Sequence, residues 1–220
     1  GKNVNVLAVR GNFDECQSAV KKIFTSEECK EELKGKGVVL SSANSINFGR
    51  LAPQIAYYFS AYLDLVSSEQ IKMGDAVDFA VPTGNFGNIL AAYYAKRMGL
   101  PVGKLICASN KNNILTDFIR TGTYDKRREF YKTMSPSMDI LISSNLERLL
   151  FELSGREPKR VKMRMDKLAA EGVYEIYDEE REELEKLFWA DFCGEDETVE
   201  TIYEFFEEYQ YPMDTHTACA

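Results

Sequence analysis

The sequence predicts an α/β protein: a parallel or mainly parallel open sheet with helices on both faces, plus an acidic helical appendage. Three observations predict it. Short apolar, β-branched runs alternate with amphipathic stretches of helical length, and parallel strands need such helical crossovers. One run, at 76–81, is followed at once by a glycine loop and a helical pattern. After Gly155 the strand-like runs stop and acidic amphipathic segments take over.

The predicted strands are apolar runs bounded by turn-forming residues. Helices are expected between them because the intervening segments begin with acidic or capping residues and carry apolar side chains at helical spacing. The strands are placed at 4–9, 38–41, 76–81, 104–109 and 139–142, and the main helices at about 14–24, 26–34, 48–66, 89–98 and 145–153. Further helices are expected at about 159–171, 178–192 and 196–209.

Composition divides the chain into three parts. Residues 1–154 are expected to form an α/β core, 155–210 an acidic helical insertion, and 211–220 the start of a segment that returns to the core. The formal net charge is −8, which argues against nucleic acid or an anionic membrane as a partner. No apolar run is long enough to span a bilayer.

The strongest functional signal is the loop 83–88, between the predicted strand at 76–81 and the helix that follows. Gly84 and Gly87 can adopt positive φ and let backbone N–H groups converge on a ligand. The helix begins at the loop, so its unpaired N–H groups and positive dipole end face the same point. The loop lacks the G-x-G-x-x-G spacing of dinucleotide sites, so the predicted ligand is a single phosphate, with a plain tight turn as the alternative.

Polar loops follow three of the predicted strands, at 41–47, 83–88 and 143–145. Because the carboxyl ends of parallel strands meet at one edge of a sheet, we expect these loops to face one pocket. Simple helix capping is the alternative for 143–145. The five cysteines are dispersed and His216 is the only histidine, so the sequence indicates reduced thiols and no metal site.

Four blocks of the sequence, in the same order, resemble threonine synthase, the pyridoxal-phosphate enzyme that converts O-phosphohomoserine to threonine and phosphate. They are SSANSINFGRLAPQIAYYF at 41–59, PTGNFGNILAAYYAKRMGLP at 82–101, SPSMDILISSNLERLLFEL at 135–153 and DTHTA at 214–218. The resemblance covers nearly the whole chain and is weakest between about 156 and 209. It implies the fold of pyridoxal-phosphate enzymes similar to the tryptophan synthase β subunit, a small-molecule substrate, threonine biosynthesis and a cytoplasmic location.

The resemblance also implies two phosphate sites. The family loop that cradles the phosphate of pyridoxal 5'-phosphate has four counterparts here, to which we add the asparagine that follows: Gly84, Asn85, Phe86, Gly87 and Asn88. The family's N-S-x-N-x-x-R segment holds the substrate phosphate, and a forked guanidinium suits that role. Its counterparts are Asn44, Ser45, Asn47 and Arg50.

The resemblance implies that this chain is an interior fragment. The family's Schiff-base lysine belongs to an earlier segment, and the part that closes the site around the pyridine nitrogen belongs to a later one. We therefore nominate no catalytic residue here and expect the chain alone to be inactive. Two alternatives stay open: another pyridoxal-phosphate enzyme of the same fold, such as a β-replacement enzyme that needs no Arg50 clamp, and a noncatalytic module that binds a phosphate ligand.

Overall fold

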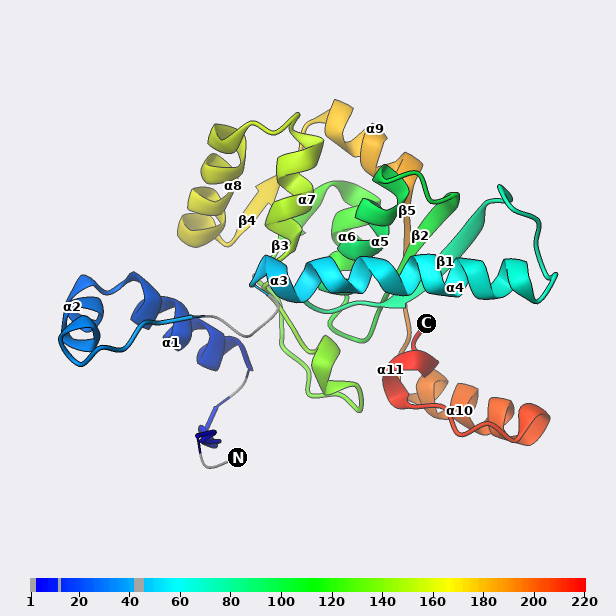
Figure 1. Ribbon diagram of the computed structural model, residues 1–220, viewed down its shortest axis with the longest axis horizontal. Coiled ribbons are helices and arrows are strands. Elements are labelled where there is room, and N and C mark those ends of the chain that lie inside the picture. The colour runs from blue at the N-terminus through cyan, green and yellow to red at the C-terminus, as the bar shows by residue number, and fades with distance from the viewer. Residues whose placement is uncertain (1–2, 12, 42–45) are drawn as a thin grey trace. The chain divides into compact units, whose positions relative to one another are not determined.

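The computed structural model describes residues 3–11, 13–41 and 46–220, and its contacts divide the chain into two units, 1–43 and 44–220 (Figure 1). The first unit contains two helices, α1 (Phe13–Thr25) and α2 (Glu27–Gly35). Ser26 separates them and caps α2, because its hydroxyl accepts the N–H of Cys29.

The strands predicted at 4–9 and 38–41 are wrong. Both segments are irregular backbone, and their apolar side chains other than the partly buried Leu40 are exposed, reaching 90% for Val6 and 89% for Val39. A β-branched run favours extended backbone, but a strand also needs a neighbour for its hydrogen bonds. In the described part of the first unit neither run has one.

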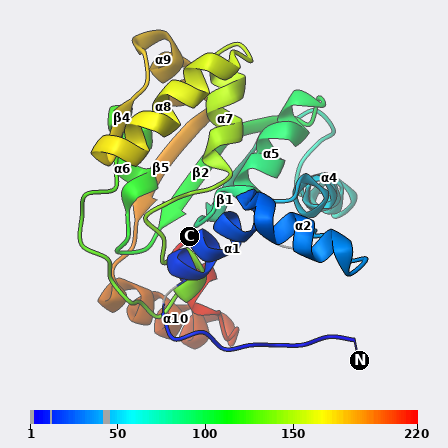
Figure 2. The same ribbon diagram turned by 90° about the vertical axis from the view of Figure 1, so that its left-hand side faces the viewer.

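The second unit is built on an open sheet of three parallel strands, which confirms the predicted fold class. The strands lie side by side in the order β1, β2, β5, with Val81 opposite Cys107 and Cys107 opposite Ala190 (Figure 2). β1 and β2 correspond to the runs predicted at 76–81 and 104–109. The strand bounds are β1 (Val77–Pro82), β2 (Val102–Ser109) and β5 (Phe188–Phe192).

The expectation that strands stop after Gly155 is wrong, because β5 lies in a stretch that was assigned to a helix. The helix α9 (Asp178–Leu187) ends early, and the chain then extends along β2 with Phe188 and Ala190 buried and Trp189 53% exposed. Residues 155–210 thus contribute a strand to the same sheet as β1 and β2. They also contribute β4 (Val173–Glu175), which pairs antiparallel with β3 (Thr123–Asp125).

The strand predicted at 139–142 is also wrong. Ile140 is buried, but this run is not paired with a strand among the described residues and follows a single 3-10 turn, η2 (Pro136–Met138). Asp139, also buried, accepts the backbone N–H of Thr133, so the local hydrogen bonds form a loop instead of a ladder.

Helices cover one face of the sheet. α5 contacts β1 and β2, α6 contacts β2 and β5, and Tyr58 of α4 packs edge-on against Phe79 of β1. On the opposite face Ala80 and Trp189 are exposed, so coverage of that face by described residues is incomplete. The remaining helices are α3 (Phe48–Leu51), η1 (Ala52–Gln54), α4 (Ile55–Ser67), α5 (Gly87–Arg97), α6 (Ile114–Thr121), α7 (Leu146–Leu153), α8 (Pro158–Glu171), α10 (Glu195–Tyr209) and α11 (Thr215–Ala218). Of the helices in the described ranges, none has the length and apolar character needed to cross a bilayer.

Candidate anion-binding site

The loop between β1 and α5 presents a row of backbone N–H groups without hydrogen-bond partners. The N–H of Thr83 still continues the sheet and donates to the carbonyl of Ala108 at 2.8 Å. From Gly84 to Ile89, no backbone N–H has a partner among the described residues, and no side chain caps α5. N–H groups left unpaired at the positive end of a helix dipole are the donors of an anion site.

The turn into α5 is made by Phe86 and not by the glycines. Phe86 has φ 62° and ψ 8°, in the left-handed region, whereas neither Gly84 nor Gly87 has a positive φ. The Phe86 side chain is 1% exposed and its ring lies 5.7 Å from that of Phe188 in β5. Burial of this ring offsets the cost of about 1–3 kcal/mol that a left-handed non-glycine residue carries. The expected positive φ of the two glycines is therefore wrong.

Gly84 is required for space instead. A Cβ on Gly84 would lie 2.5 Å from the carbonyl oxygen of Ser137 and 3.2 Å from Cα of Met138. The backbone of the turn η2 thus sits directly against the loop, and only a residue without a side chain allows that approach.

The loop 143–145 holds the anion loop in place from one side. Ser143 Oγ donates to the Gly84 carbonyl at 3.0 Å, and the Asn145 N–H and Nδ2 both donate to the Asn85 carbonyl at 3.1 Å. Ser144 Oγ donates to Asn85 Oδ1 at 3.2 Å. These bonds use the carbonyls and the side chain of the anion loop and leave its N–H groups available. The capping alternative for 143–145 is wrong for the Asn145 side chain, which makes no cap bond to α7.

Helix α4 holds the other side of the loop. Asn88 Oδ1 accepts the hydroxyl of Tyr58 at 2.6 Å, and Asn88 Nδ2 donates to Gln54 Oε1 at 2.8 Å. Gln54 Nε2 in turn donates to the Arg50 carbonyl at 2.7 Å. Burial raises the pKa of Tyr58, so its phenol stays a donor at neutral pH. The Asn88 side chain is thus bound by Tyr58 of α4 and by Gln54 of η1, and Asn88 contributes its backbone to the loop.

A small cavity of about 190 Å³ lies at this loop. Its lining is Gln54 and the residues from Pro82 to Ile89, none of which has an ionisable side chain. Attraction for an anion at this point comes from the N–H groups and the helix dipole. The nearby Cys107 is no nucleophile, because complete burial raises its pKa to about 12.

Arg148 ties the described end of the predicted substrate segment to the loop 143–145. Its Nη2 donates to the Ile46 carbonyl at 2.9 Å and its Nε to Asn145 Oδ1 at 3.3 Å, while the guanidinium lies 5.5 Å from the ring centre of Phe48. The loop 143–145 therefore contacts the anion loop and, through Arg148, the backbone at Ile46. No pattern in the sequence points to Arg148, because its partner Ile46 lies 102 positions away in the chain.

The residues predicted for the substrate phosphate are placed only in part. Asn47 caps α3, since its Oδ1 accepts the N–H of Gly49 at 2.8 Å. Arg50 lies in α3 and is exposed. Asn44 and Ser45 lie outside the described residues. In the part of the chain that the structure describes, no group of three or more histidine, cysteine or acidic side chains could hold a metal ion.

Known proteins similar to this chain share one name. The human protein "Threonine synthase-like 1" is 48% identical over 97% of this chain, which spans 29% of the human protein. Threonine synthase of Pseudomonas aeruginosa is 43% identical over 99% of this chain and 44% of the bacterial enzyme. The crystal structure of pyridoxal-phosphate-bound threonine synthase from Brucella melitensis superimposes with a TM-score of 0.85 at 43% identity, covering 99% of this chain and 44% of that one. No protein-family model matches the chain.

Proposed function

Because this chain is related in sequence and fold to threonine synthases, we propose that it supplies the cofactor-phosphate site of an enzyme that converts O-phosphohomoserine and water to threonine and phosphate. The chain spans less than half the length of these relatives, so the activity belongs to a whole protein of which these residues form a part. We place that protein in threonine biosynthesis in the cytoplasm.

The observation that supports this proposal best is the row of unpaired N–H groups from Gly84 to Ile89. A phosphate monoester carries nearly two negative charges and three acceptor oxygens at neutral pH, which suits several converging donors. No acidic side chain lines the cavity, and Gly84 places no Cβ in it. The residues of the cavity therefore fit the phosphate group of pyridoxal phosphate. This cofactor, when bound, supplies an electron sink for negative charge at the substrate α-carbon. The residues that would hold it are Gly84, Asn85, Phe86, Gly87 and Asn88.

This chain contributes binding and positioning to the reaction. Its braces, Ser143 and Asn145 on one side and Tyr58 on the other, fix the loop before an anion arrives. Donors that are already oriented need no rearrangement when charge develops. No ionisable group lines the cavity, so we propose that the imine-forming lysine comes from another segment. We also propose that residues 1–220 alone have no catalytic activity.

We assign the substrate phosphate to Asn44, Ser45, Asn47 and Arg50. Arg148 and Gln54 support this assignment, because they connect the backbone at Ile46 and Arg50 to the braces of the anion loop. A guanidinium binds a phosphate through two parallel hydrogen bonds, which a lysine cannot reproduce.

The test uses pyridoxal phosphate, pyridoxal and inorganic phosphate as probes of the 220-residue chain, followed by amide NMR. We expect pyridoxal phosphate and phosphate to shift the amides from Gly84 to Ile89 and pyridoxal to leave them unchanged. If pyridoxal shifts these amides as strongly, or if phosphate shifts none of them, the loop is not a phosphate site.

The second phosphate site is tested with Arg50→Lys in the complete enzyme. We expect O-phosphohomoserine binding to weaken by about 1.5–3 kcal/mol, the scale of a charge-assisted hydrogen bond, and cofactor binding to stay near normal. Lys34→Arg in α2, an exposed basic position, is the control. Equal loss of cofactor and substrate would contradict two separate sites.

One observation favours a second candidate. Identity to the human threonine synthase-like protein, at 48%, exceeds identity to the bacterial threonine synthase, at 43%. A related pyridoxal-phosphate lyase with another substrate is therefore the alternative. Such an enzyme would keep the loop from Gly84 to Ile89, and Arg50→Lys would not change the binding of its substrate.

A further inference from the structure

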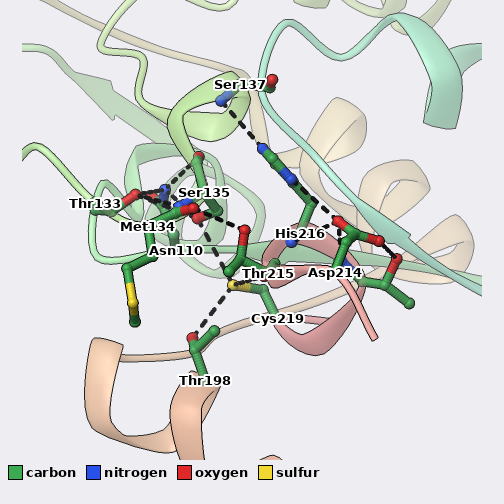
Figure 3. A network of polar contacts seen from close by, with 11 residues as sticks. Asn110, Thr133, Met134, Ser135, Ser137, Thr198, Asp214, Thr215, His216 and Cys219 are labelled. Atoms are coloured by element: carbon green, nitrogen blue, oxygen red, sulfur yellow. Dashed lines mark hydrogen bonds and ion pairs between the residues drawn. The ribbon is translucent and has the colours of Figure 1, made fainter. Parts of the chain in front are cut away.

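The DTHTA motif lies beside the anion loop, although the proposed function gives it no role. α11 begins at Thr215 with Asp214 as its cap, and Asp214 Oδ1 accepts the N–H of His216 at 2.9 Å (Figure 3). The His216 ring then lies between two partners. Its Nδ1 is 3.1 Å from the same Oδ1, and its Nε2 is 3.2 Å from the backbone nitrogen of Ser137.

These partners fix the proton on the ring. A backbone N–H can only donate, so Nε2 accepts from Ser137 and carries no proton. The ring proton is therefore on Nδ1 and is donated to Asp214. That carboxylate is ionised throughout the neutral range, because hydrogen bonds, first of all from the Thr217 hydroxyl, lower its pKa to about 2. These contacts select one tautomer of the neutral His216 ring.

The bond from Ser137 to His216 positions the turn that packs on Gly84. The Ser137 carbonyl belongs to the peptide group next to the bonded N–H, and it lies where a Cβ of Gly84 would be 2.5 Å away. Thr215 Oγ1 holds the start of the same turn by donating to the Met134 carbonyl at 2.7 Å. Two neighbouring residues of α11 therefore fix the backbone against which the anion loop rests.

We propose that His216 is a positioning residue for the anion loop, acting through Ser137, and that its neutral form is the one that keeps the loop in place. Protonation of Nε2 would put two donors face to face and release the turn. The proposal rests on the proposed function, in which the loop from Gly84 to Ile89 binds a phosphate. Among the described residues, Asp214 is the charged group in contact with the ring, and Glu195 of α10 accepts the N–H of Met134, the residue that Thr215 holds, at 3.0 Å.

The test compares wild type with three variants by hydrogen exchange and by sulfate binding. Sulfate is the probe because it stays a dianion between pH 5 and 8, whereas a phosphate monoester takes up a proton near pH 6. His216→Gln places an amide oxygen near the position of Nε2 and cannot be protonated in this range, and His216→Phe removes the acceptor. We expect wild type to bind sulfate about 5–10-fold more weakly at pH 5 than at pH 8. His216→Gln should stay within about twofold of wild type at pH 8 and lose the pH dependence.

His216→Phe should bind sulfate about 5–10-fold more weakly than wild type at pH 8, with faster exchange of the Ser137 amide and of the Asn145 amide, which donates to the anion loop at the Asn85 carbonyl. Thr215→Val is the control: it loses the bond to Met134 and weakens binding, but it keeps the pH dependence of wild type. Wild-type affinity and exchange in His216→Phe would overturn the proposal. If wild type binds no sulfate, the proposed function fails, and amide exchange at Ser137 and Asn145 still decides whether His216 positions the loop.

Discussion

Two loops leave the carboxyl ends of neighbouring strands in one sheet and use their polar residues in opposite ways. After β1, the residues Gly84 to Ile89 keep their backbone N–H groups unpaired, while the side chains of Asn85 and Asn88 are bound to neighbouring elements. After β2, the loop 110–113 turns its asparagine side chains inward, and Asn110 and Asn112 are 1% and 3% exposed. Both loops contain asparagines and follow a buried strand. In the loop after β1, which we call the open loop, the backbone N–H groups stay unpaired. In the loop after β2, which we call the filled loop, the asparagine side chains are buried.

The filled loop is organised by one buried carboxylate. Asp139 Oδ1 accepts Asn110 Nδ2 and Asn112 Nδ2, each at 2.9 Å, and the Thr133 hydroxyl at 2.7 Å, while Oδ2 accepts the Thr133 N–H at 3.0 Å. This network uses the side-chain amides of both asparagines within the fold. The comparison shows that asparagine side chains at the carboxyl edge of a sheet do not by themselves mark a binding site.

The largest effect that the comparison leads us to expect is in the filled loop. Asp139→Ala would remove the carboxylate that the amides of Asn110 and Asn112 and both donors of Thr133 share, and it would leave the Thr133 N–H without an acceptor among the described residues. Each unsatisfied buried group costs about 1–3 kcal/mol, and partial relaxation brings the expected loss of unfolding free energy to about 3–5 kcal/mol. Urea denaturation measures it.

The control for Asp139→Ala is Asp166→Ala, on the exposed face of α8, where the carboxylate pairs only with exposed Lys162. This change should cost under about 1 kcal/mol. If Asp139→Ala costs no more than its control, the filled loop is not a structural network and the contrast between the two loops fails.

The second effect is in the open loop and appears mainly in binding. Gly84→Ala forces a Cβ to within 2.5 Å of the Ser137 carbonyl oxygen, a backbone atom, so either the loop or the turn η2 must move. We expect phosphate binding to fall at least about tenfold, and the strain to cost about 1–3 kcal/mol of stability. Isothermal titration with inorganic phosphate and urea denaturation measure the two effects. Gly35→Ala in α2, where no heavy atom lies within 4 Å of the added Cβ, is the control and should leave both unchanged.

What the sequence predicts well is local. Pro82, the glycines and the apolar run after them lie within a few residues of one another, and β1 and α5 form close to where the sequence predicts them. What fails depends on distant partners. The run 4–9 is apolar enough for a strand but pairs with nothing in the described residues, whereas FWADF at 188–192 follows an acidic helix and becomes a strand because β2 offers a free edge.

The same holds within the site. The loop residues Gly84 to Asn88 were predicted, but the braces around them were not, because they come from far along the chain: Tyr58 and Asn88 are 30 positions apart, and Arg148 and Ile46 are 102 apart. Even the reason for Gly84 is a distant one. Its missing side chain makes room for Ser137 and does not serve a positive φ.

The smallest effect is expected from the hydrogen bond by which Tyr58 of helix α4 holds the open loop at Asn88. Tyr58→Phe removes the hydroxyl that donates to Asn88 Oδ1 at 2.6 Å and leaves that oxygen without this donor. We expect a loss of about 0.5–1.5 kcal/mol in unfolding free energy at pH 7 and a twofold to threefold weaker affinity for phosphate. Tyr57→Phe, at a neighbouring tyrosine that is 61% exposed, is the matched control and should change neither quantity.

The pH dependence of Tyr58→Phe separates the phenol from a general packing effect. Burial raises the pKa of Tyr58 in the folded chain, whereas a tyrosine in an unfolded chain ionises near pH 10. The folded state therefore holds a proton that the unfolded state releases, and wild-type stability must fall as the pH rises above about 10. In Tyr58→Phe this contribution is absent, so the gap between the two proteins should narrow between pH 9 and pH 11. A gap that stays constant over this range would mean that the Tyr58 hydroxyl does not hold Asn88, and the open loop would then depend on the loop 143–145 alone.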